Sequence, residues 1–522
     1  MDRQGHAYPL YEHPEITNFG QLVSLMADNA PSDTAFQYMN KKRTVTITHL
    51  QFQQDIKRLA GFFQQHGLKD SKIAVLGENS YLWILTYFAA VLSSNVIVPI
   101  DKELETGEIS DLLTQCGAVA LVSSDTYVDI AEELREQGVI GTIFNMADFQ
   151  SVLSDEDNYE FSLNETDENA VCSIIFTSGT TGKPKGVMLT QRSLMLDAVN
   201  SIRNVGITGP SMLTLPLHHT FAFTTSVLGE YACGLPIPIS SSLRTFNADM
   251  QTFKPQNICL VPLYVETMYK NIWKTAKTQK KDKILKLLIA FSNFTRRFGI
   301  DLRRKFFHSI LSQFGGNLDL HICGGAPIDQ RYVDGMTDIG LQVLNGYGIT
   351  ECSPVVAVNR NKYSKKHSVG LPLHGCEVKI VDGEICVKGD IVMVGYYHDE
   401  AATQEVMKDG WFKTGDLGYL DKDGFLFISG RKKNLIILSN GENVCPEELE
   451  EKLLRIDGIK EVIVSVEDNL ITAEIYTEDP TGIQDSIGVL NKALPAYKRI
   501  QKVKFRSSEF AKTTTRKIKR TR

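Results

Sequence analysis

The chain has 522 residues, too many for one ordinary hydrophobic core, so two or more domains are expected. Apolar residues make up 43% and charged residues 23%, as in an ordinary globular protein, and the net charge of −6 argues against a nucleic-acid partner. The nine dispersed cysteines form no C-x-x-C pair, and neither an apolar leader nor an apolar run of membrane-spanning length is found, so we expect reduced thiols and a cytoplasmic protein.

Strand and helix patterns alternate along the first part of the chain. Strands are expected at residues 72–76, 96–100, 118–122 and 142–144, and helices at 81–90 and 105–116. This order is typical of βαβ units, so we predict an α/β fold with doubly wound sheets. The strand pattern resumes at 171, 258 and 320, and a basic segment of helical period lies at 273–314.

The pattern changes twice towards the end of the chain. Short β-type runs with Gly-Asp turns at 376–428 predict an antiparallel β-subdomain. After residue 430, a helix at 446–454, strands at 462–466 and 471–476, and a helix at 483–494 predict a small α+β domain. We therefore expect one large domain over residues 1–430 and a small one over 431–522.

One run is the most informative part of the sequence. An apolar strand pattern stops at Thr177 and is followed by hydroxyls, glycines and lysines, at Ser178, Gly179, Thr180, Thr181, Gly182, Lys183 and Lys185. Backbone N–H groups at tight glycine turns, together with hydroxyls and ammonium groups, are suited to holding a polyphosphate. The run is not the P-loop of kinases and GTPases, because the first Gly lies too close to the Gly-Lys pair and Pro184 follows the lysine.

This run resembles the phosphate loop of the AMP-forming adenylating superfamily, which contains acyl-CoA synthetases, adenylation domains of peptide synthetases, and luciferases. Further motifs follow in the order of that superfamily, from about residue 20 to about residue 520. The resemblance implies that the large domain holds the ATP and acyl sites. It also implies a mobile small domain with a catalytic lysine and a thiol-access loop, Mg²⁺ as the metal, and ATP and CoA as co-substrates.

Activation of a carboxylate by ATP brings two anions together, so the site needs cations and well-placed N–H donors. The string Leu215-Pro-Leu-His-His-Thr-Phe221 resembles the superfamily's P-L-x-H segment and places His219 near the substrate carboxylate. The string Asn345-Gly-Tyr-Gly-Ile-Thr-Glu351 resembles its G-Y-G-x-T-E motif. The resemblance implies that Gly325 and Ala326, in the Gly-Gly-Ala-Pro turn, line the adenine and that Tyr347 stacks on it. It also implies that Thr350 and Glu351 contact the α-phosphate and that Glu351 binds Mg²⁺.

Five further residues are placed by resemblance. Asp416, in Gly410-Trp-Phe-Lys-Thr-Gly-Asp416, and Arg431 would contact the ribose, and Lys433 would be the hinge of the small domain. Lys517 falls on the lysine that bridges carboxylate and α-phosphate, although Ala511 and Arg516 stand where proline and glycine are usual. Gly441 would let the small domain's loop approach the pantetheine tunnel.

The substrate is expected to be a medium- or long-chain fatty acid. Amino-acid activators usually place an Asp soon after the histidine segment, whereas residues 220–229 hold no acidic side chain, and a buried ammonium without a counter-charge is costly. The segments around 261–270 and 438–450 also resemble fatty acyl-CoA synthetases. The alternatives are a stand-alone ligase that loads an acyl carrier protein, activation of an aryl acid, and a non-catalytic nucleotide-binding homologue.

The basic insertion after Trp273 is the one feature that suggests a surface partner. It is interpreted as a solvated amphipathic helix pair, while its arginines could instead touch anionic lipid or CoA phosphates. Peripheral membrane contact is thus possible but not favoured over the solvated interpretation.

Overall fold

The structure is a computed structural model, and it describes residues 8–155, 159, 161–163, 167–177, 184–242, 244–438, 442–467, 470–512, 518 and 520. The chain divides into two compact units. Unit 1 comprises Met1–Glu377 and Val387–Phe412, and unit 2 comprises Val378–Cys386 and Lys413–Arg522. We expect residues 431–522 to move together as one small domain. This domain boundary after residue 430 stays a prediction.

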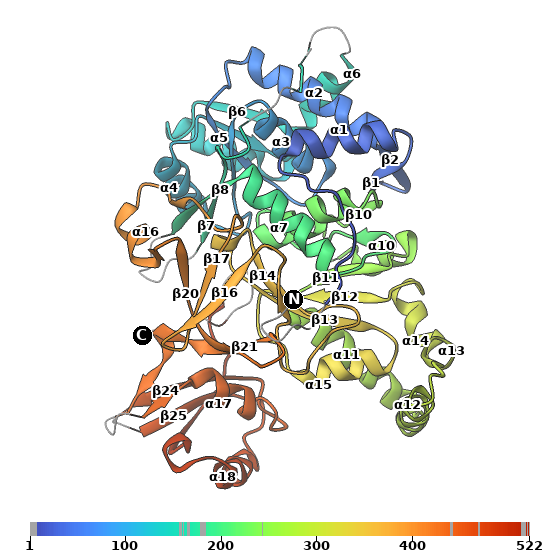
Figure 1. The fold of residues 1–522 in the computed structure, drawn as a ribbon, viewed down its shortest axis with the longest axis vertical. Helices are drawn as coiled ribbons and strands as arrows, with labels where there is room; N and C mark the ends of the chain where they lie inside the picture. Colours follow the sequence, from blue (N-terminus) through green and yellow to red (C-terminus); the bar gives the residue numbers. More distant parts are fainter. Residues whose placement is uncertain are drawn as a thin grey trace. The chain divides into compact units, whose positions relative to one another are not determined.

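The first sheet of unit 1 has seven strands and confirms the expected βαβ series (Figure 1). Its central strands pair in parallel, and β7, β8 and β18 pair antiparallel at one edge. In spatial order the strands are β18 (Gly395–Tyr396), β8 (Lys185–Thr190), β7 (Val171–Thr177), β4 (Val96–Pro99), β3 (Lys72–Leu76), β5 (Ala120–Ser123) and β6 (Thr142–Asn145). Its apolar side chains form one buried cluster with the neighbouring helices.

The helices of this part of unit 1 are α1 (Phe19–Asn29), α2 (His49–Gln65), α3 (Tyr81–Leu92), α4 (Thr106–Cys116), α5 (Val128–Glu136), α6 (Phe149–Ser154) and α7 (Gln191–Asn204), with short 3₁₀ turns η1 (Asp125–Tyr127) and η2 (Met146–Asp148). Helix α4 shows why these segments begin and end where they do. The side chains of Glu105 and Glu108 form a capping box at its start, and Gly117 ends it with φ of 64°.

The second sheet of unit 1 has six strands. In spatial order they are β15 (Leu371–Pro372), β14 (Val355–Val358), β13 (Gln342–Gly348), β12 (Leu320–Cys323), β11 (Asn257–Leu260) and β9 (Ser211–Met212). Strands β9, β11, β12 and β13 are parallel, so their carboxyl ends share one edge. In α/β proteins that edge is where ligands bind.

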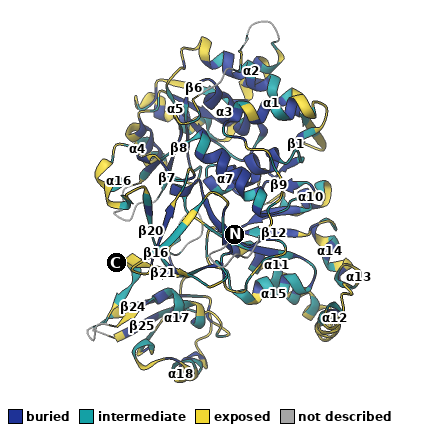
Figure 2. Ribbon diagram, viewed as in Figure 1, coloured by how far each residue is buried: buried dark blue, intermediate teal, exposed yellow. Residues whose placement is uncertain are grey.

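The helical segments that accompany this sheet are α8 (Thr220–Phe223), the π-helical turn η3 (Thr224–Gly229), α9 (Glu230–Ala232), α10 (Phe246–Phe253), α11 (Pro262–Thr278), α12 (Asp282–Arg296), α13 (Arg303–Phe306), α14 (His308–Leu311), η4 (Ser312–Phe314), α15 (Gln330–Asp338) and η5 (Thr350–Cys352). The expected helical insertion at 273–314 is therefore confirmed. Much of its surface is exposed, as the yellow positions on α12–α14 show (Figure 2).

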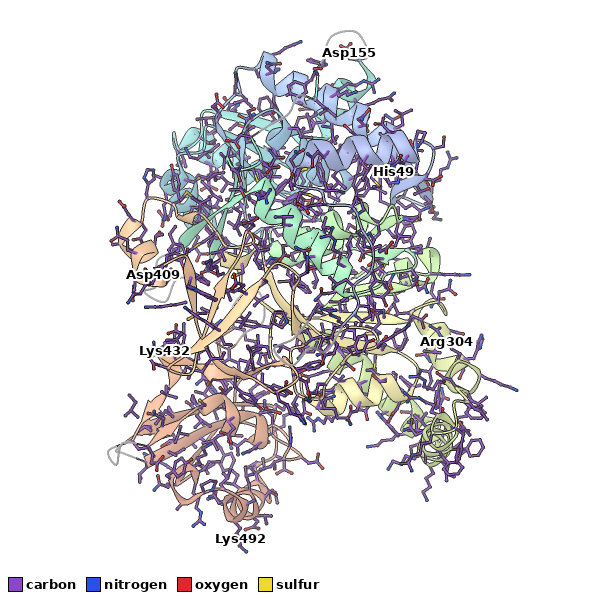
Figure 3. All side chains as sticks on the ribbon, in the orientation of Figure 1. His49, Asp155, Arg304, Asp409, Lys432 and Lys492 are labelled. Carbon is purple, nitrogen blue, oxygen red and sulfur yellow. The ribbon has the colours of Figure 1, made fainter. Side chains whose placement is uncertain are left out.

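A smaller sheet joins distant parts of the sequence in unit 1. It consists of β10 (Ile237–Ile239), β1 (Thr34–Asn40) and β2 (Arg43–Thr48). Phe36, Phe52 and Tyr231 stack against it in an aromatic core, and the buried ring of His49 lies 5.0 Å from that of Tyr231 (Figure 3). Burial lowers the pKa of His49, which suits a neutral ring in this core.

The remaining elements include the expected β-subdomain and the small α+β fold. The β-subdomain has β16 (Glu377–Val381), β17 (Glu384–Lys388), β20 (Trp411–Leu420), β19 (Met407–Lys408) and β21 (Leu426–Arg431), and α16 (Glu400–Val406) precedes β19. After β21 the chain has η6 (Lys432–Asn434), β22 (Ile436–Ile437), β23 (Asn443–Val444), α17 (Pro446–Leu453), β24 (Glu461–Glu467), β25 (Leu470–Tyr476), α18 (Ile483–Ala493), η7 (Ala496–Lys498) and β26 (Lys502–Arg506).

Candidate functional site

The β7–β8 hairpin carries the two ends of the proposed phosphate loop. Thr177 ends β7 and lies opposite Lys185 at the start of β8, and its hydroxyl donates to the Lys185 carbonyl at 3.5 Å. The residues expected between them, Ser178, Gly179, Thr180, Thr181, Gly182 and Lys183, lie outside the described residues. The antiparallel pairing therefore brings the two ends of the loop together, and β8, which carries the second end, pairs with β18.

Tyr396 joins the phosphate hairpin to the Thr-Glu motif. It lies in β18 opposite Val187, and the ammonium group of Lys185 sits 4.7 Å from its ring centre. Its hydroxyl donates a hydrogen bond of 2.8 Å to Oε1 of Glu351, whose residue is only 8% exposed. One tyrosine thus links two candidate residues that are 166 positions apart in the sequence.

The electrostatic surroundings keep this tyrosine a donor. Burial, followed by the negative charge of Glu351 and their hydrogen bond, raises the pKa of Tyr396 well above its usual range. The phenol is therefore protonated at neutral pH and fixes the orientation of the Glu351 carboxylate. The sequence analysis missed Tyr396, since it lies in no recognised motif and only its pairing with β8 reveals it.

The end of β13 positions Tyr347, Thr350 and Glu351. Gly348 is required there, because a Cβ atom at this position would lie 2.4 Å from the carbonyl oxygen of Pro354. Tyr347 pairs with Ala357 across the sheet, and the chain then turns through η5 so that the Glu351 carbonyl accepts from Met393 N–H at 2.8 Å. The motif is therefore held by backbone pairing on both sides.

The buried carboxyl group of Asp197 supports the same turn from α7. Its Oδ2 accepts a 2.9 Å hydrogen bond from the N–H of Val355, directly after the turn. Burial raises the pKa of Asp197 well above its usual range. The contact ties the first residue of β14 to the helix that follows the phosphate hairpin.

The Gly-Gly-Ala turn lies at the same edge of the sheet, after β12. Gly324 donates to the Leu260 carbonyl at 3.3 Å, and a Cβ atom on Gly324 would lie 3.2 Å from the ring of Phe221. Gly325 has φ of +83°, a conformation that favours glycine, and Ala326 is half-buried. The turn therefore meets the segment that carries His219.

His219 is the N-cap residue of α8 and lies at the end of a loop that the Asn79 side chain holds by two hydrogen bonds. The Asn79 side chain donates to the Leu215 carbonyl at 2.9 Å and accepts from Leu217 N–H at 3.1 Å. The rings of His218 and His219 lie 4.0 Å apart; the His218 side chain is 9% exposed and His219 is half-buried. Burial, then the charges of His219 and Lys102, lowers the pKa of His218 well below its usual value, so His218 is neutral.

Apolar side chains surround this histidine segment. Leu215, Ala222 and Cys259 form a buried cluster, against which Phe221, Val261 and Ile322 pack. A π-helical turn follows at Thr224–Gly229, a feature that is frequent at functional sites. The segment therefore places His219 beside an apolar cluster.

In unit 2, Asp416 and Arg431 lie together. They are opposite one another in β20 and β21, and Arg431 Nε is 3.0 Å from Asp416 Oδ1. The neighbouring Lys432 is paired with Glu384 at 2.7 Å, and Lys433 lies in η6. The two expected ribose contacts are therefore brought together by strand pairing.

Two expected residues of the small domain, Gly441 and Lys517, lie outside the described residues. The chain on both sides of Lys517 is held, since Lys512 pairs with Ile518 and its Nζ lies 2.5 Å from Oε1 of Glu461. Phe510 N–H also donates to Glu461 at 2.8 Å. This anchors the segment that carries Lys517 to β24.

A carboxylate of the Glu351 type fits a magnesium ion. Proteins usually hold Mg²⁺ with one or two carboxylates together with substrate phosphates, and Thr350 adds a hydroxyl next to Glu351. Within the described residues, no group of three His, Cys, Asp or Glu side chains could hold a metal.

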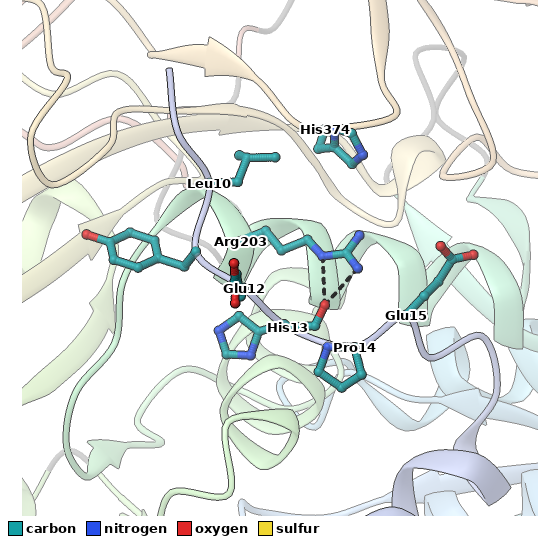
Figure 4. A pocket seen from close by; sticks show the side chains of 8 residues that line it. Leu10, Glu12, His13, Pro14, Glu15, Arg203 and His374 are labelled. Carbon is teal, nitrogen blue, oxygen red and sulfur yellow. Dashed lines mark hydrogen bonds between the residues drawn. The ribbon is translucent and has the colours of Figure 1, made fainter. Parts of the chain in front are cut away.

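A surface cavity of about 540 Å³ lies elsewhere, along the N-terminal segment (Figure 4). It is lined by residues 10–15 with Arg203 and His374, and it includes none of the motif residues. The Arg203 guanidinium donates to the His13 carbonyl at 2.8 and 3.3 Å, which holds the segment in place. This cavity is therefore not the candidate nucleotide site.

Glu230 gives a prediction on stability. It is fully buried in α9, and burial raises its pKa to about 8, against an opposing effect of the Ser211 hydroxyl. Between pH 4.5 and about 8 the unfolded state releases this proton while the folded state keeps it, so stability is lost as pH rises. The side chain of Glu230→Gln cannot ionise. The melting temperature of this variant minus that of the wild type should therefore increase from pH 5 to pH 8.

The matched control is Glu136→Gln, at an exposed position on α5. Its melting temperature should differ from that of the wild type by the same amount at every pH. Thermal scans followed by circular dichroism measure both variants. If the Glu230→Gln difference is also independent of pH, the pKa of Glu230 is not raised in the folded protein.

Comparison with known proteins identifies the family. The AMP-binding enzyme family model matches residues 25–397. The chain is 28% identical over 452 residues to the long-chain-fatty-acid–CoA ligase of Mycobacterium bovis, covering 79% of this chain and 74% of that protein. It is 30% identical over 440 residues to the 2-succinylbenzoate–CoA ligase of Listeria monocytogenes, covering 83% of each.

A solved structure shows the same fold. The O-succinylbenzoate coenzyme A synthetase of Bacillus subtilis in complex with AMP has a TM-score of 0.77 at 24% identity and covers 95% of this chain and 96% of its own. The same enzyme in complex with ATP and a magnesium ion has a TM-score of 0.75 at 23% identity and covers 95% of this chain and 98% of its own. The expected α/β fold class is thereby confirmed.

The motif order, the fold and the family match agree. The resemblance to the adenylating superfamily is confirmed, and so is the expectation of an enzyme of that class. The chain belongs to the AMP-binding enzyme family.

Proposed function

We propose that this protein is an ATP-dependent acid–CoA ligase. The observation that carries the proposal is the link from Lys185 through Tyr396 to Glu351, which brings the phosphate hairpin and the Thr-Glu motif to one place. A carboxylate oxygen would attack the α-phosphorus of ATP, forming acyl-AMP and releasing pyrophosphate. The thiol of CoA would then attack the acyl carbonyl and release AMP.

The proposed roles are those that the resemblance implies, and charge explains several of them. Lys185 and the phosphate loop bind the polyphosphate, and Lys517 offsets the charge of the carboxylate as it meets the α-phosphate. Glu351, oriented by Tyr396, would hold Mg²⁺, which when bound neutralises phosphate charge. Asp416 and Arg431 would hold the ribose, Gly325, Ala326 and Tyr347 the adenine, and His219 the substrate carboxylate.

For the substrate we propose a medium- or long-chain fatty acid. The apolar cluster beside His219 favours an aliphatic chain, since each buried methylene contributes about 0.8 kcal/mol. An α-amino acid is disfavoured, because Glu230, the first acid after His219, is buried with its pKa raised to about 8 and is mostly protonated at pH 7.

Two alternatives remain within the same chemistry. An aryl acid is the second candidate substrate, supported by the 30% identity to a 2-succinylbenzoate–CoA ligase. An acyl carrier protein is the second candidate thiol acceptor. Both alternatives share the adenylation step and differ only in the acyl pocket or in the approach of the thiol.

One assay tests the reaction and the substrate together. Exchange of labelled pyrophosphate into ATP should depend on Mg²⁺ and on a carboxylic acid, and should rise along a series of fatty acids until the pocket is full. Succinylbenzoate and amino acids serve as comparison substrates, with CoA or a carrier protein added afterwards. Formation of ADP instead of AMP would contradict the reaction, and best exchange with an aryl or amino acid would contradict the fatty-acid assignment.

A further inference from the structure

Helix α12 and the turn that follows it carry a stripe of exposed apolar residues. Figure 2 shows that positions on this helix are exposed. Its members recur at alternating spacings of three and four residues and therefore lie on one face. The stripe consists of Ile284, Leu287, Phe291, Phe294 and Phe298, which are 52–70% exposed. A contiguous apolar face of this kind on a protein surface marks an interaction site.

The stripe is not needed for the core of unit 1. The opposite face of α12 packs inward, with Leu285 only 6% exposed and Leu288 and Ile289 against the same buried cluster. Phe294 and Phe298 contact each other edge to face at 5.2 Å, within the stripe itself. The helix is therefore held by one face while the other is left for a partner.

Exposed basic side chains border the stripe. At about 100° per residue, Lys283, Lys286 and Arg297 fall together along one side of it. Residues 274–305 hold eleven basic and two acidic side chains, a net charge of +9 in a chain whose net charge is −6. The positive charge is thus concentrated beside the apolar face.

Three of the basic residues in this segment serve the fold. Arg296 Nη1 lies 4.0 Å from Oδ1 of Asp338. Arg303 pairs with Asp301 at 2.6 Å, and its guanidinium donates to the Thr337 carbonyl at 2.7 Å. Arg304 pairs with Asp319 and donates to the Gly316 and Leu318 carbonyls at 2.9 and 2.7 Å (Figure 3). The lysines beside the stripe are different, since within the described residues the ammonium groups of Lys283 and Lys286 have no acidic partner.

We propose that this face of α12 docks on the surface of an anionic membrane. An amphipathic helix with apolar side chains on one face and lysines or arginines beside them lies in the lipid interface, with the cations against anionic headgroups. A second copy of the chain fits less well, because it would bring two segments of net charge +9 against each other. None of the described helices is long and apolar enough to cross a bilayer, so the contact is peripheral.

The test is co-sedimentation of the full chain with vesicles of phosphatidylcholine alone or mixed with phosphatidylglycerol. The wild type should bind the anionic vesicles and lose binding at high salt. Leu287→Glu/Phe294→Glu should reduce binding at least about tenfold. Lys283→Glu/Lys286→Glu should also reduce it at least about tenfold, since each basic residue near the surface contributes about fivefold.

Matched controls make the same chemical changes elsewhere. Val489→Glu alters an apolar residue of α18 that is 67% exposed, and Lys69→Glu/Lys492→Glu reverses two exposed lysines. Both should bind like the wild type. Melting curves by circular dichroism show that each variant is folded, so the test does not depend on the proposed reaction.

Three results would overturn the proposal. Equal binding to neutral and anionic vesicles would show that the basic border plays no part. Equal binding by Leu287→Glu/Phe294→Glu and Val489→Glu would show that the stripe plays no part. A wild-type dimer that the stripe variant converts to a monomer without vesicles would show that a second copy covers this face.

Discussion

Replacement of Lys517 by alanine is expected to slow acyl-adenylate formation about 10²–10³-fold. The lysine is proposed to offset charge only while the carboxylate meets the α-phosphate. Conversion of supplied acyl-adenylate to thioester should therefore continue at close to the wild-type rate. The two half-reactions are measured separately, by pyrophosphate exchange and by thioester formation from synthetic acyl-adenylate.

Gly441→Trp should have the opposite effect. Added bulk in the proposed thiol-access loop would close the approach of the thiol while Lys517 still reaches the adenylation site. This reciprocal result is expected if the small domain serves both steps by turning about the proposed hinge at Lys433. If each variant loses the two half-reactions in equal proportion, the alternating-domain proposal is wrong.

Lys512→Ala is the matched control for the loss of a cation in the same terminal segment. Its ammonium group lies 2.5 Å from Glu461 and 2.7 Å from Glu509, so it anchors the segment. Loss of this anchor should affect Lys517 docking only weakly and leave thioester formation unchanged. A defect as large as that of Lys517→Ala would mean that segment placement, and not the Lys517 charge, limits adenylation.

Glu351→Gln is expected to lower pyrophosphate exchange about 10²-fold or more and to raise the Mg²⁺ concentration needed for half-maximal rate. The amide keeps the shape of the side chain but removes the negative charge proposed to hold the ion. Titration of the exchange rate with Mg²⁺ at fixed ATP measures both effects. An unchanged Mg²⁺ dependence would show that Glu351 does not bind the metal.

Tyr396→Phe tests the positioning of that carboxylate. The lost hydrogen bond is to a charged group and is worth about 1.5–3 kcal/mol, so exchange should fall at least about tenfold. Because the carboxylate itself remains, Tyr396→Phe should change the Mg²⁺ dependence of the exchange rate. The double variant Glu351→Gln/Tyr396→Phe should lose no more exchange than Glu351→Gln alone. The control is Tyr397→Phe, at the next residue, which should behave as the wild type.

Much of the fold could be predicted from local pattern. The segments predicted as strands at 72–76 and 142–144 are strands. The apolar segment predicted as a helix at 81–90 is a helix that extends to Leu92. Residues 72–76 and 81–90 are mostly buried in βαβ units, so nearly every side chain in them is apolar and the signal is strong, whereas 142–144 is only partly buried. The antiparallel placement of β8 and β18 at the sheet edge was not predicted, because pairing partners are distant in sequence.

The candidate site likewise contains residues that local motifs reveal and residues that only the tertiary structure reveals. The phosphate run, the histidine segment and the Thr-Glu motif could be recognised as strings, since each concentrates unusual residues in a few positions. Tyr396 could not, because a single tyrosine acquires its role only from β18 pairing with β8 beside Glu351. Asp197 and Asn79 are likewise single polar residues whose contacts depend on distant segments.

By itself, the sequence determined the chemistry this protein is equipped for: a polyphosphate loop, a candidate metal carboxylate and a histidine segment with no acid in the ten residues that follow His219. The tertiary structure decided which of those groups meet and which faces remain open. In α12 apolar residues occur on two faces, and the sequence cannot tell which one packs. Leu285 is buried and Leu287 is 70% exposed only because α11 and α15 cover one side of the helix. Burial depends on what other segments bring to a residue, and a local pattern does not contain that information.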